Sequence, residues 1–143
     1  MATFPFTGDP LSQIEVIYVG YFARAGDSTG TNFWISQFLG AGSTQAALNQ
    51  IAGQFSQTPE AKAEYPFLAS PLTASQAQIT AFINQVYQNL FGRNSDPAGL
   101  AFWQGQINAA LATMNPTVIA AQLGVFIENV ALVPGIISPR NVI

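Results

Sequence analysis

The sequence predicts an all-α fold, a bundle of six to seven helices made of two tandem three-helix repeats. Three observations indicate this fold. Apolar residues recur with the period of about 3.6 residues that is typical of an α-helix. A motif around Tyr18 returns around Tyr87. No alternating apolar segments with hairpin turns predict strands, and 143 residues are the length of one ordinary domain.

The internal repeat organises the chain. Identical residues recur at an offset of 69 positions, from Tyr18 to Tyr87, and they include both tryptophans. The repeated residues are Tyr18, Phe22, Arg24, Asp27, Gly30, Phe33, Trp34 and Gln37, which return as Tyr87, Phe91, Arg93, Asp96, Gly99, Phe102, Trp103 and Gln106. Later the offset is 71, from Gly53 to Gly124, as an insertion in a connecting loop would produce. The predicted divisions of the single domain 1–143 are repeat one at 10–68, a linker at 66–74, repeat two at 75–134 and a C-terminal tail at 135–143.

The first helix of repeat one is predicted to start at Asp9 and Pro10. An aspartate at the N-cap accepts amide hydrogens that have no partner within the helix, and a proline in the first turn has no such hydrogen. The apolar face of this helix is Ile14, Ile17, Tyr18, Tyr21 and Phe22. Asp27 predicts the N-cap of the second helix. The apolar face of the second helix is Phe33, Trp34 and Phe38.

The third helix of repeat one is predicted to start at Ser43 or Thr44, because both are suitable N-cap residues. Its apolar face is Leu48, Ile51 and Phe55. Thr58 and Pro59 predict a short additional turn that runs to Tyr65. The prolines and small polar residues that follow predict the linker.

Repeat two follows the same plan. The apolar face of its first helix is Ile79, Phe82, Ile83, Val86, Tyr87, Leu90 and Phe91. Gly92 ends this helix, since glycine adopts the left-handed conformation of a helix end without steric cost. Asp96 and Pro97 predict the start of the second helix, and Asn115 and Pro116 predict that of the third. Their apolar faces are Leu100, Trp103 and Ile107, and Ile119, Leu123, Phe126, Ile127 and Val130.

The composition excludes most classes of enzyme. Without cysteine or histidine, the chain has no thiol nucleophile, no Ser-His-Asp arrangement and none of the usual zinc ligands. The one helical pair of carboxylates is Glu60 and Glu64, beside Lys62 on a face that we predict to be solvated. We therefore predict a protein that is not an enzyme, with no catalytic residues, no cofactor and no metal site.

The low content of charged residues indicates which kinds of partner to expect. Charged residues make up 8% of the chain, compared with about 25% in an average soluble domain. Four basic residues and a net charge of −3 argue against nucleic acid as a partner. A surface with little charge repulsion favours self-association or association with other domains of a parent protein.

Targeting features are also missing. No apolar run reaches the roughly 18 residues that a membrane-spanning helix needs, so we expect no membrane insertion. Residues 1–6 lack the basic and long apolar regions of a cleavable signal peptide. The protein then either stays inside the cell or is exported by a signal that lies elsewhere in a longer chain.

A family resemblance rests on residues 82–103, which combine a tyrosine-bearing helix, a Gly-Arg loop, an aspartate, a glycine and an aromatic-Trp pair. This segment resembles a family of helical bacterial domains of unknown function. The family occurs in type I-secreted proteins with calcium-binding nonapeptide repeats, in S-layer-like proteins and in adhesins, and is distantly similar to phycobilisome linker domains. Repeat one departs from the pattern at Ala23, where glycine is usual. The resemblance implies a building block of a secreted or cell-surface protein that has no cleavable N-terminal signal peptide.

Two interpretations apply to the charged and tryptophan residues that both repeats share. The candidate ligand residues are Arg24, Asp27, Trp34, Arg93, Asp96 and Trp103. In one interpretation they bind a sugar or a carboxylate, with the tryptophans as stacking platforms. In the other, which we favour, the aspartates cap helices, the arginines satisfy carbonyls at the end of the preceding helix and the tryptophans face the core. Calcium is disfavoured because each loop offers one carboxylate.

Two functional hypotheses follow. The first is a non-enzymatic structural or interaction module of a secreted bacterial surface protein, used in S-layer-like or adhesin-like assembly or in anchoring to the cell surface. Its partners would be a second copy, other domains of the parent protein or cell-surface polysaccharide. The alternative is a module that binds a glycan or another small ligand at the Arg/Asp/Trp loops.

Overall fold

The protein is all-α, as predicted. The computed structural model describes residues 10–131, and this range holds eight α-helices, one 3₁₀ turn and no strand. The elements are α1 (Pro10–Phe22), α2 (Ser28–Gly40), α3 (Gln45–Phe55), α4 (Pro59–Glu64), α5 (Pro66–Ala69), η1 (Pro71–Thr73), α6 (Gln76–Phe91), α7 (Pro97–Ala112) and α8 (Pro116–Ala131). The predicted N-cap at Asp9 and the predicted C-terminal tail lie outside the described residues.

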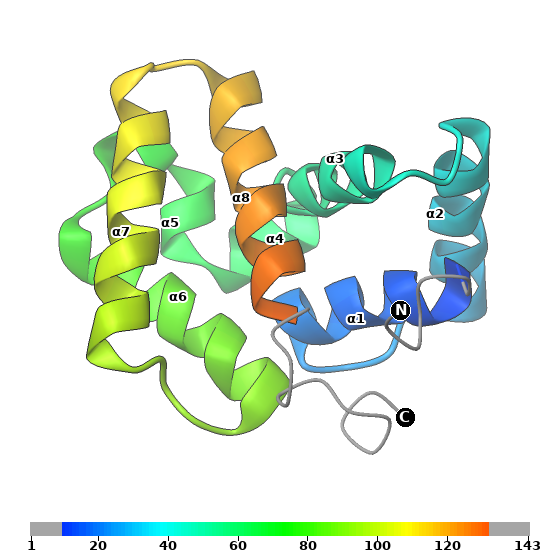
Figure 1. The fold of residues 1–143 in the computed structure, drawn as a ribbon, viewed down its shortest axis with the longest axis horizontal. Coiled ribbons are helices and arrows are strands. Elements are labelled where there is room, and N and C mark those ends of the chain that lie inside the picture. The colour runs from blue at the N-terminus through cyan, green and yellow to red at the C-terminus, as the bar shows by residue number, and fades with distance from the viewer. Residues whose placement is uncertain (1–9, 132–143) are drawn as a thin grey trace.

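The helices form two similar halves that share a centre (Figure 1). α2 lies at one end of the long axis and α7 at the other, with α1, α3, α6 and α8 between them. The most extensive contact between two helices joins α3 to α8, and a second contact across the repeats joins α1 to α6. Each repeat therefore packs its first and third helices against the same helices of the other repeat.

The crossing of α3 and α8 depends on two glycines that are equivalent in the repeats. A Cβ atom on Gly53 would overlap the carbonyl oxygen of Ala120, and one on Gly124 would overlap that of Asn49. Asn49 and Ala120 are themselves separated by the repeat offset of 71. The two halves thus meet about an internal two-fold relation, with the helix backbones in direct contact.

A second equivalent pair lies where α1 crosses α6. The Asn89 side chain donates a hydrogen bond of 3.0 Å to the carbonyl of Gly20, 69 positions earlier. Nearby, the buried Tyr21 hydroxyl donates to Ala52 O at 2.8 Å, and the Tyr65 hydroxyl donates to Tyr21 O. These bonds satisfy polar groups inside a core that both repeats share.

The segment predicted as a linker contains helical turns. Pro66 and Pro71 occupy the first positions of α5 and η1. Phe67 and Leu68 of α5 are buried in the core, and the Phe67 ring lies 5.3 Å from that of Phe82. Here proline starts helical turns rather than excluding them, because the first helical position needs no amide hydrogen.

Most helix ends follow the predicted caps. Thr44, and not Ser43, caps α3, with its hydroxyl oxygen accepting from Ala47 N at 3.0 Å. Thr58 caps α4 in the same way. Gly92 ends α6 with a left-handed φ of 73°, as predicted. Ala23, its equivalent after α1, adopts a φ of 58° despite its side chain, a conformation that costs an alanine roughly 1 kcal/mol.

Candidate functional site

The candidate ligand residues lie at one helix corner in each repeat. We call residues 23–27 the repeat-one corner and residues 92–96 the repeat-two corner. Asp27 accepts a hydrogen bond from Gly30 N at 2.7 Å, and Asp96 accepts one from Gly99 N at the same distance. Both aspartates are N-caps, which confirms the capping prediction. Their carboxylates serve the fold at the starts of α2 and α7.

A tyrosine from the preceding helix stands over each corner. A Cβ atom on Gly30 would overlap the Tyr18 hydroxyl, and one on Gly99 would lie 3.5 Å from the Tyr87 hydroxyl. At both positions a Cβ atom would also overlap the capping carboxylate, at 2.8 Å from Asp27 Oδ1 and 2.7 Å from Asp96 Oδ1, and this shared overlap explains why both repeats carry glycine there. Burial raises the pKa of both tyrosines, with the neighbouring aspartates adding to the increase. Both phenols are therefore neutral at physiological pH.

One pair of equivalent residues that bind the corners was not found in the sequence, because the residue type differs between the repeats. Glu15 accepts a hydrogen bond from Gly26 N at 2.8 Å, and Asn84 accepts one from Ser95 N at 3.1 Å. Glu15 and Asn84 share the offset of 69, and both offer a side-chain oxygen. A comparison of hydrogen-bonding capacity instead of identity would have found them.

Contrary to our prediction, the arginines donate hydrogen bonds to carbonyls of their own loops and not to carbonyls at the end of the preceding helix. Arg24 Nη1 donates to Ala25 O at 3.0 Å, and Arg93 Nη1 donates to Asn94 O at 3.0 Å. Each side chain folds over its own loop because the carbonyl of the next residue is within reach. Each guanidinium also lies over a phenylalanine ring of the preceding helix, at 5.5 Å for Arg24 and 6.0 Å for Arg93.

The tryptophans pack against the core. The Trp34 ring lies 4.6 Å from Phe55, and the Trp103 ring lies 5.1 Å from Phe126. Phe33, which we predicted on the apolar face of its helix, is 54% exposed, and its equivalent Phe102 is 55% exposed. The exposure of both phenylalanines follows from helix geometry. The adjacent tryptophan faces the core, and successive side chains on a helix point about 100° apart, so the phenylalanine faces away from the core.

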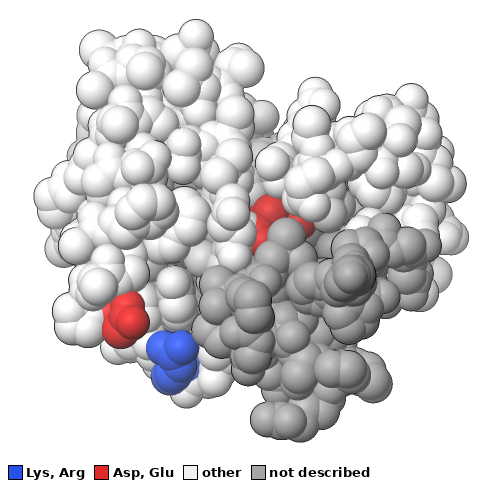
Figure 2. All heavy atoms as spheres, viewed as in Figure 1, with Lys and Arg blue, Asp and Glu red and all other residues white. Residues whose placement is uncertain are grey.

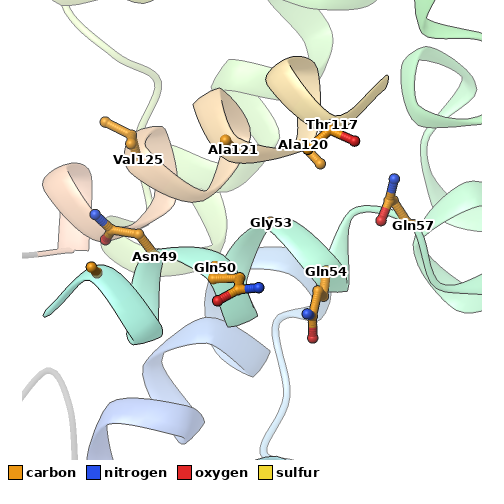
Figure 3. Close-up of a pocket in the computed structure, with 10 residues that line it drawn as sticks. Asn49, Gln50, Gly53, Gln54, Gln57, Thr117, Ala120, Ala121 and Val125 are labelled. Atoms are coloured by element: carbon orange, nitrogen blue, oxygen red, sulfur yellow. The ribbon is translucent and has the colours of Figure 1, made fainter. Parts of the chain in front are cut away.

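A groove between α3 and α8 lies apart from both corners. It has a volume of about 360 Å³. Figure 3 shows Asn49, Gln50, Gln54 and Gln57 on one wall and Thr117, Ala120, Ala121 and Val125 on the other. Its lining side chains are uncharged. The sequence does not indicate this groove, because the groove forms where two helices that are distant in the sequence cross.

Among residues 10–131 no three acidic, histidine or cysteine side chains are grouped to hold a metal ion. None of the described helices is long and apolar enough to cross a membrane. Glu60, one of the two carboxylates considered for catalysis, forms an ion pair with Arg24.

Together these features define a charge-poor helical module that carries the same helix corner twice. Residues 67–121 match a family described as Domain of unknown function (DUF4214), a span that runs from α5 into α8. The match agrees with the resemblance to a helical domain of unknown function. No curated protein and no solved structure matches the chain.

Proposed function

We propose that the protein is a non-enzymatic interaction module of a secreted bacterial surface protein, working in assembly or in anchoring to the cell surface. The observation that carries the proposal is the exposure of Phe33 and Phe102, by 54% and 55%, at equivalent positions of the two repeats. Half-exposed aromatic rings are typical contact points of protein interfaces.

The placement of the two rings supports assembly into extended arrays. The helices that carry them, α2 and α7, lie at opposite ends of the long axis (Figure 1). A subunit with contact points at opposite ends can join a neighbour at each end. The described surface in Figure 2 is largely uncharged, so little electrostatic repulsion opposes such contacts.

Sedimentation velocity over a concentration series tests the proposal. The wild-type chain is expected to self-associate, and the double variant Phe33→Ser/Phe102→Ser to remain monomeric with a similar thermal unfolding curve. Leu72→Ser is the matched control, because Leu72 is an exposed apolar residue, at 47%, that lies in η1 instead. A wild-type chain that is monomeric at every concentration, or a double variant that associates as the wild type does, would contradict the proposal.

A further inference from the structure

The two corners hold their arginines in the same way. In each, Nη1 donates at 3.0 Å to the carbonyl of the following residue, Ala25 or Asn94. In each, the guanidinium lies over the ring of the last residue of the preceding helix, Phe22 or Phe91. Both guanidinium groups therefore share these two contacts, and the Arg24 guanidinium also lies 5.7 Å from the Tyr18 ring.

The corners differ in the contact that the second terminal guanidinium nitrogen, Nη2, makes. Arg24 Nη2 donates to both carboxylate oxygens of Glu60, at 2.8 and 2.6 Å. Glu60 lies in the first turn of α4, which starts at the Thr58 cap. This ion pair raises the pKa of Arg24, first through the hydrogen bond from its guanidinium to Glu60.

Repeat two has no counterpart of Glu60. At the offset of 71, the position of Glu60 corresponds to Ala131, the last residue of α8. Among the described residues Arg93 makes no ion pair, and its hydrogen bond goes to the Asn94 carbonyl. Asn84 also replaces Glu15 beside the loop. Repeat two thus keeps the oriented arginine and loses two carboxylates, so an incoming anion meets less repulsion there.

We propose that the repeat-two corner binds a carboxylate of a partner protein through Arg93, as the repeat-one corner holds Glu60 through Arg24. The occupant is an acidic helix start, with a glutamate in its first turn, because that is the structure that fills the equivalent place in repeat one. Figure 2 shows basic and acidic groups together near the junction of α6 and α7, on a described surface that is otherwise largely uncharged. The proposal rests on the proposed function and names the chemistry of one contact.

Side-chain NMR of arginine tests the proposal in the full chain. The chain has three arginines, Arg24, Arg93 and Arg140, so the Nε–Hε region is simple, and the loss of one signal in Arg93→Lys assigns it. The probe is a synthetic peptide with the sequence of residues 57–65, which contains Glu60. We expect it to shift the Arg93 signal progressively and to leave the Arg24 signal in place, because Glu60 of the same chain already occupies Arg24.

Opening the repeat-one corner supplies the matched control. In Glu60→Gln the peptide is expected to shift Arg24 as well as Arg93. The fold should persist, since the side chains of this ion pair are 47% and 50% exposed and exposed ion pairs contribute little to stability. A probe peptide with glutamine in place of its first glutamate should lose most of the shift at both arginines.

Four results would overturn the inference. The first two are a wild-type Arg93 signal that the peptide does not shift, and wild-type Arg24 and Arg93 signals that it shifts equally. The third is a glutamine peptide that shifts the signals as much as the glutamate peptide does. The fourth is a shift of the Arg93 signal by oligogalacturonate but not by the peptide, which would identify an acidic polysaccharide instead. Sedimentation separates this failure from that of the proposed function. If the phenylalanine variants abolish association while the peptide leaves the Arg93 signal unchanged, only the proposed carboxylate site is refuted.

Discussion

Glu128 of α8 is a buried carboxyl group that forms no ion pair within residues 10–131. Glu128 is 3% exposed, and its Oε2 atom has no hydrogen-bond partner among the described residues. Oε1 has one distant partner, Gln45 Nε2 at 3.5 Å. Burial raises the pKa of Glu128 to about 8, and the weak bond from Gln45 lowers it slightly. Glu128 is thus mostly protonated at neutral pH, because no cation in the described part of the chain offsets the cost of burying its charge.

Glu128→Gln is expected to make the fold more stable at high pH. In the wild type, an unfolded chain releases the Glu128 proton above about pH 4.5 while the folded chain retains it up to about pH 8. Stability therefore falls across this window as pH rises, by at most about 1.4 kcal/mol per pH unit, and levels off above it. Urea unfolding from pH 4 to 9 should show that the free energy of unfolding of the variant increases relative to that of the wild type as the pH rises through this window. Equal pH dependence in Glu128→Gln and in the exposed control Glu64→Gln would refute the assignment.

Elements were predictable where their causes are local. The starts of α2 and α7 at Asp27 and Asp96, and the end of α6 at Gly92, follow from side chains that bond within one turn. The ion pair of Arg24 with Glu60 and the crossing of α3 over α8 join residues far apart in the sequence. Neither periodicity nor capping carries that information, so the groove and the open repeat-two corner emerged from the structure.

The glycine crossing of α3 and α8 makes a prediction about these elements. Gly53→Ala should destabilise the fold by about 3 kcal/mol, because the added methyl overlaps the Ala120 carbonyl oxygen and forces the two helices apart. Gly124→Ala should behave alike, since it meets the Asn49 carbonyl. The control is Gly105→Ala in α7, where nothing lies near the new Cβ and better helix propensity should add up to about 1 kcal/mol.

Urea unfolding followed by circular dichroism measures these changes. The sign of the effect decides the interpretation, because alanine is the better helix former at all three positions. A Gly53→Ala chain as stable as Gly105→Ala would show that the α3 and α8 backbones do not touch.

At the scale of the whole molecule, the repeats share one core instead of stacking as separate bodies. The Phe82 ring of repeat two lies 6.3 Å from Tyr21 of repeat one and 5.6 Å from Phe126 of its own repeat. The Tyr65 hydroxyl accepts from Asn89 at 3.3 Å, which links the end of repeat one to α6. Separating the repeats would expose both crossings at once. The sequence predicted two tandem three-helix repeats, whereas the extensive contact between them depends on these pairs of residues that are distant in the sequence.

The shared core predicts that both repeats unfold together, and the two tryptophans report on them separately. Trp34→Phe leaves Trp103 as the probe of repeat two, and Trp103→Phe leaves Trp34 as the probe of repeat one. In each variant the urea midpoint from fluorescence should equal the midpoint from circular dichroism, which reports on all helices. Each indole packs on the third helix of its own repeat, at Phe55 or Phe126, so it responds as soon as that repeat opens. Fluorescence that changes before the helical signal in either variant would mean that one repeat opens alone, and the two halves would then be neighbouring bodies with separate stabilities.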